Sequence, residues 1–90
     1  PAFDKGVPVK ACIEIVQGIP KSWSNTKTIK AERGEIAPVS RNGDIDNIAK
    51  SILDALNTLA YEDDAQVTTL IVSKKYGADP CAIVRIDEDF

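Results

Sequence analysis

Histidine is absent from this 90-residue chain, and its absence excludes several classes of site at once. Most zinc sites, Ser-His-Asp triads and Cys-His nucleophiles need an imidazole. The two cysteines, Cys12 and Cys81, do not form a metal-type pair. Each lies in a strand-like segment, so we expect buried or half-buried free thiols. Catalysis would therefore have to depend on carboxylates, on lysine, or on a metal held by oxygen ligands.

Long apolar runs are missing as well. No segment approaches the roughly 20 apolar residues of a membrane-spanning helix, so no membrane association is expected. Residues 1–8 are charged and interrupted by prolines, unlike a secretory signal, and a cytoplasmic location is expected by default. The length predicts one domain over residues 1–90 with a modest core, which makes oligomerisation a reasonable source of extra stability.

The net charge of −3 is unevenly distributed along the chain. Residues 1–43 carry seven Lys/Arg and four Asp/Glu, which gives +3, whereas residues 44–90 carry four Lys/Arg and ten Asp/Glu, which gives −6. A basic half followed by an acidic half suggests phosphate attraction in the first and metal binding in the second. Chance scatter in a short chain explains the same numbers and, on charge alone, is the preferred explanation.

Hydrophobic periodicity predicts the first elements. Residues 7–16 alternate between apolar and polar side chains, which is typical of a strand. Residues 21–33 predict a short helix, with Ser22 or Ser24 as its N-cap and Gly34 past its end, and residues 35–43 predict a loop. The strongest pattern covers residues 46–60, where apolar side chains recur every three or four positions. Leu53 and Leu56 belong to this helical stripe, and we expect both in the core or in a dimer interface.

The remaining residues predict two strands. Residues 61–65 read as an acidic turn, and strands follow at residues 66–76 and 81–86. The turn at residues 77–80 joins these strands, so a hairpin is expected, and residues 87–90 are expected to fray. The order of elements predicts an α+β fold, with a small mixed sheet and one long and one short helix packed on it.

Carboxylates at both ends of the long helix suggest a metal site. Asp44 and Asp46 are two residues apart at its start, so in an extended segment both side chains point the same way. Asp63 and Asp64 follow its end. Mg²⁺ prefers oxygen ligands of this kind. The helix measures roughly 20 Å, however, so Asp64 begins the next strand at the end away from Asp44, and how the two would meet stays open.

Each of these residues also has an ordinary structural role to weigh. Asp44 and Asp46 could cap the helix, and from spacing alone capping is the commoner role. Asp63 and Asp64 could simply form a polar turn. Lys50 lies one turn after Asp46, where an i,i+4 ion pair is common. The spacing of these residues alone does not decide between such structural roles and a metal site.

The same residues closely resemble a known pair of motifs. Residues 43–57 (Gly-Asp-Ile-Asp-Asn-Ile-Ala-Lys-Ser-Ile-Leu-Asp-Ala-Leu-Asn) are similar to the D-x-D-N-xx-K-xxx-D-A-L motif of RusA-type Holliday-junction resolvases. Residues 61–67 (Tyr-Glu-Asp-Asp-Ala-Gln-Val) resemble the D-D-x-Q segment of that family, at a matching spacing. Residues 19–24 and 74–77 look like the loop and the hairpin of its phage and prophage members. The resemblance extends from about Val9 to Ile86.

This resemblance implies a RusA-like fold and an endonuclease that cuts four-way DNA junctions, with Mg²⁺ as its cofactor and Mn²⁺ as a possible substitute. The positions that match the family's catalytic, metal-binding aspartates are Asp44, Asp46 and Asp64. Lys50 matches its catalytic lysine, and Asp54 and Gln66 match further motif positions. Members of the family are homodimers with two active sites, one for each strand that is nicked.

The resemblance also suggests which residues contact DNA. Basic residues would hold the DNA backbone, namely Lys21, Lys27, Lys30, Arg33 and Arg41. Trp23 would pack on a sugar or a base near the branch point. A solvated helix with Trp23 as its anchoring aromatic explains these six residues equally well.

One departure from the family concerns the start of the chain. Members normally begin with a further strand and a basic, proline-containing segment before the region that matches Val9, whereas residues 1–8 precede it here. An N-terminally shortened single nuclease domain is therefore expected. Two other interpretations stay open. The chain could be a truncated, catalytically inactive DNA-binding or structural remnant of the family, or a small module that binds a metal or a partner through the helix stripe.

Overall fold

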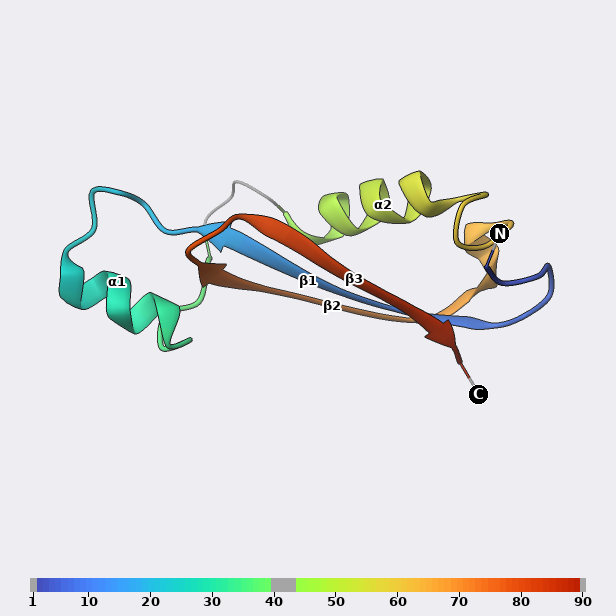
Figure 1. Ribbon diagram of the computed structural model, residues 1–90, viewed down its shortest axis with the longest axis horizontal. Helices are drawn as coiled ribbons and strands as arrows, with labels where there is room; N and C mark the ends of the chain where they lie inside the picture. The colour runs from blue at the N-terminus through green and yellow to red at the C-terminus, as the bar shows by residue number, and fades with distance from the viewer. Residues whose placement is uncertain (1, 40–43, 90) are drawn as a thin grey trace.

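A computed structural model of the chain describes residues 2–39 and 44–89 (Figure 1). The elements in chain order are β1 (Val9–Gly18), α1 (Asn25–Glu32), α2 (Ile45–Leu56), the 3-10 turn η1 (Asp64–Gln66), β2 (Val67–Gly77) and β3 (Cys81–Glu88). The strands form one mixed sheet in the order β2-β1-β3. α2 lies along one face of the sheet, and α1 lies beyond the end at which β1 terminates. The predicted α+β fold with a small mixed sheet, one long helix and one short helix is confirmed.

β1 is the central strand, and its sequence explains why. Val9, Ala11, Ile13 and Ile15 alternate along it, and all four are buried. β2 pairs with β1 in parallel, with Val72 opposite Ile13, and β3 pairs with the other edge of β1 in antiparallel orientation. The strand with the most apolar face therefore lies farthest from water, and its backbone N–H and C=O groups find partners on both edges.

The expected hairpin between the last two strands is wrong. β3 pairs with β1 rather than with β2, so β1 separates the two. The link at residues 78–80 crosses two strand spacings, roughly 9.5 Å, which a few extended residues at about 3.3 Å each can span. It passes over the end of β1, where a Cβ added to Gly18 would lie 2.9 Å from Pro80 Cγ. The local turn signal predicted that the chain reverses, but it carries no information about which strand becomes the partner.

α2 ends at Leu56 rather than at the predicted residue 60. Asn57 is already extended, with a ψ of 130°, and Thr58 lies in the left-handed region, with a φ of 70°. The burial of Tyr61 accounts for this early end. Its ring is fully buried, and its hydroxyl donates a hydrogen bond of 2.8 Å to the Leu53 carbonyl, which the last turn of the helix leaves without a backbone partner.

α1 begins at Asn25, later than the predicted residue 21. Ser24 is its N-cap and accepts a hydrogen bond from the Lys27 backbone N–H at 3.2 Å, so one of the two predicted caps is confirmed. Gly34 has a φ of 80°, which confirms the predicted glycine past the helix end. Neither helix in the described part of the chain is long and apolar enough to cross a membrane.

The core lies between α2 and the sheet. Ile13 and Ile15 of β1 pack against Ala49 of α2, and half-buried apolar side chains surround them: Ile45, Ile48, Ile52, Leu53 and Val72. The small side chain of Ala49 lets the helix backbone approach the sheet closely. The prediction that Leu53 contributes to the core is confirmed, and Leu56 is half-buried.

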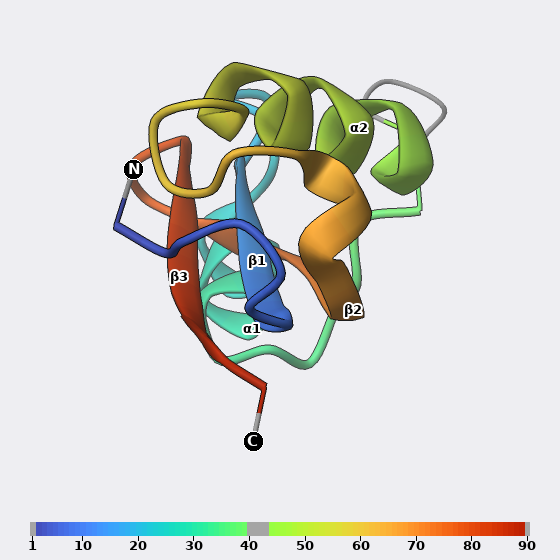
Figure 2. The same cartoon turned by 90° about the vertical axis from the view of Figure 1, so that its right-hand side faces the viewer.

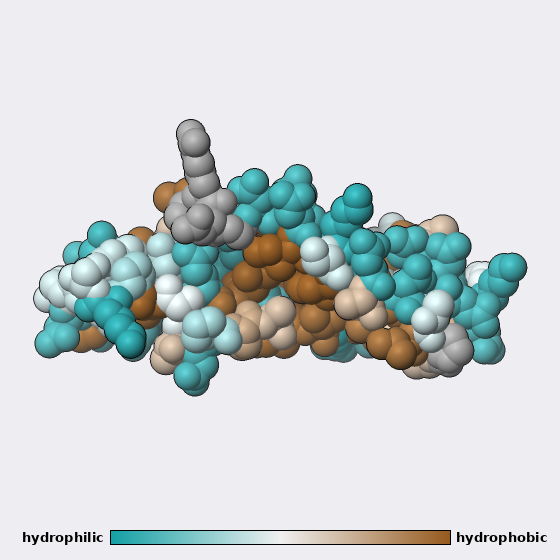
Figure 3. Space-filling view, turned by 90° about the horizontal axis from the view of Figure 1, so that it is seen from above, coloured by the Kyte–Doolittle hydropathy of each residue, from teal (hydrophilic) through white to brown (hydrophobic). Residues whose placement is uncertain are grey.

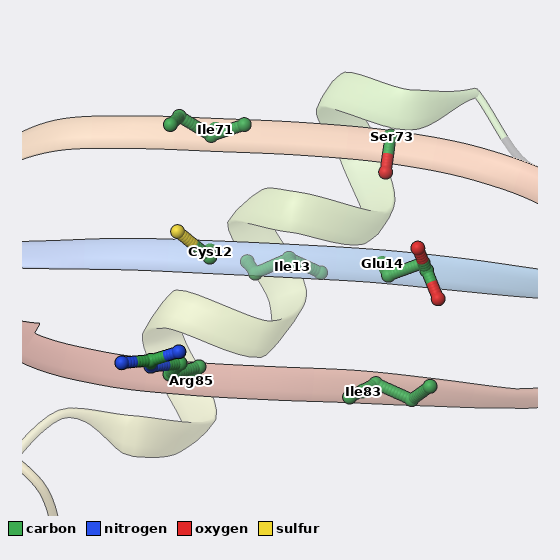
Figure 4. A pocket seen from close by; sticks show the side chains of 7 residues that line it. All are labelled: Cys12, Ile13, Glu14, Ile71, Ser73, Ile83 and Arg85. Carbon is green, nitrogen blue, oxygen red and sulfur yellow. The ribbon is translucent and has the colours of Figure 1, made fainter.

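The other face of the sheet carries exposed apolar side chains. Figure 4 views this face, with Cys12, Ile71 and Ile83 in front of their strands and Ile13 behind β1, on the side of α2. Ile71 and Ile83 are 51% and 54% exposed. Cys12 is half-buried and Cys81 is exposed, and both thiols are free. The expectation of buried or half-buried thiols is therefore confirmed for Cys12 and wrong for Cys81, because Cys81 begins an edge strand.

Candidate active site

The first predicted site residues lie at the start of α2. Asp44 occupies the N-cap position, but its side chain makes no capping hydrogen bond. Asp46, in the first turn, accepts a hydrogen bond from the Asn47 backbone N–H at 3.0 Å. Both carboxylates are exposed. Side-chain capping, the alternative role weighed for Asp44, is therefore not used, and its carboxylate is available to a ligand.

Lys50 is exposed and lies one turn after Asp46. Within residues 2–39 and 44–89, no salt bridge joins Lys50 to Asp46 or to Asp54. The i,i+4 ion pair weighed as its ordinary role is therefore not formed. Residues four apart on a helix are neighbours, so the Lys50 ammonium group can approach a phosphate that a cation holds beside Asp46.

The second group of site residues forms the turn before β2. Asp63 is the N-cap of η1, and its Oδ1 accepts a hydrogen bond from the Ala65 backbone N–H at 3.0 Å. The role of a polar turn residue therefore applies to Asp63. Asp64 is exposed and is the first residue of η1, directly after Asp63.

The two carboxyls of this turn differ in pKa. The pKa of Asp63 is lowered, first by the Ala65 N–H and then by the hydrogen bond from Asp64. The pKa of Asp64 is raised, first by its hydrogen bond to Asp63, then by desolvation and by the negative charges of Asp63 and Asp54. Asp64 therefore keeps its proton to a higher pH than Asp63, and a cation that binds Asp64 competes with that proton.

The structure does not bring the two groups together within one chain. Asp44 precedes α2 and Asp64 follows it, and a helix of 12 residues is about 18 Å long. Figure 1 shows the turn η1 beyond the far end of α2. The acidic neighbours of Asp64 are Asp63 and Asp54. In the described residues, no group of three or more Asp, Glu, Cys or His could hold a metal ion.

Asp44 and Asp46 nevertheless have the chemistry that Mg²⁺ prefers. This cation takes oxygen ligands, and in proteins it commonly uses one or two carboxylates together with waters and substrate phosphates. Two exposed carboxylates at the start of one helix, one at its N-cap and one in its first turn, meet that requirement. The donor set of a single chain therefore fits the cation, and a contribution from Asp64 would have to come from a second chain.

The predicted DNA-binding residues surround α1. Those that the structure describes are all exposed: Lys21, Lys27, Lys30 and Arg33. Arg41 lies outside the described residues. α1 lies at one end of the molecule and η1 toward the other, and the start of α2 is the end of that helix nearer to α1 (Figure 1). The basic side chains are therefore on the side of Asp44 and Asp46 rather than of Asp64.

Trp23 is held by two contacts. Its ring meets the Tyr76 ring edge-on, with centroids 5.1 Å apart and an interplanar angle of 66°. The Lys27 ammonium lies 3.9 Å from the centroid of the indole. These contacts attach the segment before α1 to the end of β2. They are the arrangement expected of an anchoring aromatic, the alternative weighed for this residue.

Gln66 is the motif residue whose role the sequence left unassigned. Its side chain is buried, and it makes four hydrogen bonds to backbone groups. Two of these partners, Asp4 and Val7, are 62 and 59 residues away in sequence. The D-D-x-Q spacing marked the position, but no local pattern predicts contacts over such a separation.

Comparison with known proteins identifies relatives of this chain. The family model described as endodeoxyribonuclease RusA matches residues 3–87. The uncharacterized protein YqaN of Bacillus subtilis (strain 168) is 43% identical over 83 residues. That alignment covers 90% of this chain and 58% of YqaN, so the chain spans little more than half the length of this curated relative. No solved structure matches the chain.

Proposed function

The chain belongs to the RusA endodeoxyribonuclease family, and we propose that it is a Mg²⁺-dependent endonuclease that resolves four-way DNA junctions by hydrolysing two phosphodiester bonds symmetrically. The observation that carries this proposal is the pair of carboxylates at the start of α2. Asp44 and Asp46 are exposed, Asp44 is not used as a side-chain cap, and Lys50 follows one turn later without an ion-pair partner in the described residues.

The residues divide the chemistry between them. A bound Mg²⁺, or Mn²⁺ in its place, supplies a Lewis acid that positions water and stabilises charge on the phosphate. Asp44 and Asp46 hold it through oxygen ligands. Lys50 lies beside this pair and offsets negative charge at the scissile phosphate or at the leaving oxygen. Asp64 provides a further carboxylate.

A homodimer is part of the proposal, because it supplies the carboxylate that one chain places too far away. A two-fold axis beside α2 would run two copies of the helix antiparallel. Asp44 and Asp46 of one subunit would then lie beside Asp64 of the other subunit. Such a dimer has two equivalent sites, and two sites match the two strands that are cut in a four-way junction.

The surface of α2 supports this arrangement. An open groove of about 340 Å³ runs along the helix, and three of its lining side chains are apolar: Ile48, Ile52 and Ala55. Figure 3 views the molecule from this side, with apolar surface in the middle beside a row of hydrophilic side chains. An apolar strip along a helix is the kind of surface that a second copy of the same helix can cover.

DNA binding is proposed for the basic end of the molecule. Lysine and arginine side chains around α1 are exposed, and the start of α2 is the end of that helix nearer to α1 (Figure 1). A duplex arm held there by its phosphates would lead its backbone toward Asp44 and Asp46. Because such contacts release counterions, junction affinity should fall steeply as the salt concentration rises.

Cleavage of a labelled four-way junction tests the proposal. In Mg²⁺, the wild type should produce paired, symmetric nicks, and Asp44→Asn should abolish them while junction binding persists. Glu88→Gln, which neutralises an exposed carboxylate at the end of β3, is the matched control and should cleave normally. Binding without nicks by the wild type, at any Mg²⁺ or Mn²⁺ concentration, would instead favour an inactive DNA-binding relative.

A further inference from the structure

We propose that Gln66 is a positioning residue, which fixes the turn of Asp63 and Asp64 against the N-terminal segment so that Asp64 can bind a cation. The inference rests on the proposed function, because it assumes that Asp64 is a cation ligand. Gln66 does not touch the cation in this scheme. It acts by holding the backbone that carries the ligand.

The acceptor side of the amide holds the acidic turn. Gln66 Oε1 accepts hydrogen bonds from the backbone N–H groups of Glu62, at 3.0 Å, and Asp63, at 3.1 Å. The Asp63 carboxylate completes a capping box around the same turn. Asp64 follows Asp63 directly and is the first residue of η1. Hydrogen bonds therefore connect the buried amide to the backbone of the turn that carries the proposed ligand.

The donor side of the amide holds the beginning of the chain. Gln66 Nε2 donates to the carbonyl oxygens of Asp4, at 2.8 Å, and Val7, at 3.0 Å. A second attachment lies close by, where the Phe3 N–H donates to the Ala60 carbonyl at 3.0 Å. Figure 2 shows the N-terminal segment passing beside η1. Residues 3–7 therefore form a brace for the acidic turn, and Gln66 joins the two.

The amide has no hydrogen-bonding capacity to spare. A glutamine side chain offers two N–H donors and one carbonyl oxygen with two lone pairs. All four are used at Gln66. Gln66 is 9% exposed, and no other polar or charged residue in the described part of the chain is buried. An apolar replacement would leave two N–H groups and two carbonyls with no partner, so the turn and the brace would separate locally.

Gln66→Met tests the role, because methionine has a similar length and cannot replace these hydrogen bonds. Backbone amide exchange at Glu62 and Asp63 should accelerate. Mn²⁺ affinity, measured by calorimetry on the protein without DNA, should fall about 10–100-fold, as for other residues that orient a metal ligand. Junction cleavage at low Mg²⁺ should fall by a similar factor and recover at high Mg²⁺, with junction affinity unchanged.

Val72→Ala is the matched control. Val72 packs against the core on β2, in the same strand that Gln66 precedes, and does not belong to the acidic turn. Measured at a temperature where both variants are folded, it should lower stability without changing Mn²⁺ affinity. Gln66→Glu keeps an oxygen acceptor for Glu62 and Asp63. Its Mn²⁺ affinity should therefore lie between that of Gln66→Met and that of the wild type.

The outcomes separate this inference from the proposed function. Faster exchange in Gln66→Met with unchanged Mn²⁺ affinity would overturn the positioning role and leave Gln66 as a structural residue. A wild type that binds no Mn²⁺ would overturn it as well. Weaker Mn²⁺ binding by Gln66→Met, in a protein whose wild type never nicks a junction, would support the positioning role and reject the nuclease function.

Discussion

Asp44 and Asp64 lie at opposite ends of α2, one at its N-cap and the other in the turn that follows it. The cause is topological. β1 and β2 are parallel, so the helix that connects them runs antiparallel to both. Residues before and after such a helix must lie at opposite ends of the sheet. A site that uses both carboxylates therefore needs two copies of α2.

Mixing two inactive variants tests this shared site. Asp44→Asn and Asp64→Asn should each fail to cleave as homodimers. In a mixed dimer, one site would carry both substitutions and the other would carry neither. The mixture, refolded together, should therefore regain cleavage in one intact site of each mixed dimer, seen as single-strand nicks in place of paired ones.

A site built within one chain gives a different result. Each subunit would then carry one damaged site, and no mixing ratio would restore nicking. Mixing Asp44→Asn with Asp46→Asn provides the internal control, because both residues are contributed by the same end of the same helix. That mixture should stay inactive under either arrangement.

Ala55→Arg should disrupt the proposed dimer. Ala55 is exposed and lines the groove on α2, so a long charged side chain there would block a second helix. Light scattering after gel filtration should report a monomer, and cleavage should be lost. Thr26→Arg, at an exposed position of α1, should leave the mass unchanged. A monomeric wild type would contradict the dimer at once.

Ile13→Ala should be among the most destabilising substitutions in the sheet. Ile13 is 2% exposed and packs against α2, so truncation should lower the free energy of unfolding by about 2–5 kcal/mol. Ile83→Ala, on the exposed face, should cost less than about 1 kcal/mol. Urea unfolding at one fixed protein concentration measures both. If both substitutions lowered the free energy of unfolding equally, the face of the sheet that carries Ile83 would be covered in solution.

Trp23 and Lys30 should affect different properties. Trp23→Ala removes the contacts with Tyr76 and Lys27, and should lower the free energy of unfolding by about 1–2 kcal/mol. Lys30→Ala should change stability by less than about 0.5 kcal/mol. It should weaken junction binding and make the salt dependence of log K shallower by about one unit. If Trp23→Ala kept full stability but bound the junction more weakly, Trp23 would be a DNA-contacting residue rather than an anchoring aromatic.

Asp89 should make the free energy of unfolding depend on pH in the acidic range. Its carboxylate accepts hydrogen bonds of 2.6 Å from the hydroxyls of both Thr68 and Thr69, which lower its pKa. A carboxyl whose pKa is lower in the folded state stabilises the protein above its unfolded pKa, about 3.9. That contribution is lost as the pH falls through the lower folded value.

Asp89→Asn should therefore reduce stability at neutral pH, and the difference from the wild type should vanish in strong acid. Urea unfolding across the pH range measures this difference. Replacing both Thr68 and Thr69 with Val should return the Asp89 pKa to its ordinary range in an NMR titration. A wild-type Asp89 that titrates at the ordinary value would contradict the hydrogen bonds seen in the structure.

Features that depend on neighbouring residues follow from the sequence alone. Alternating side chains indicated β1, and apolar side chains at three- and four-residue spacing indicated α2. The paired motifs around Asp44 and Asp64 identified the family that the comparisons confirmed. The functional roles carried over for Asp44, Asp46, Asp64 and Lys50 stay predictions.

Features that depend on contacts between distant segments are set by the tertiary structure. It placed β3 beside β1, because a turn of a few residues can reach either strand. It ended α2 early, because the burial of Tyr61 outweighs the helical pattern of the residues before it. It separated Asp44 from Asp64, and it gave Gln66 partners some 60 residues away. Local periodicity encodes how one element is built, whereas strand pairing and buried polar contacts depend on the packing of the whole chain.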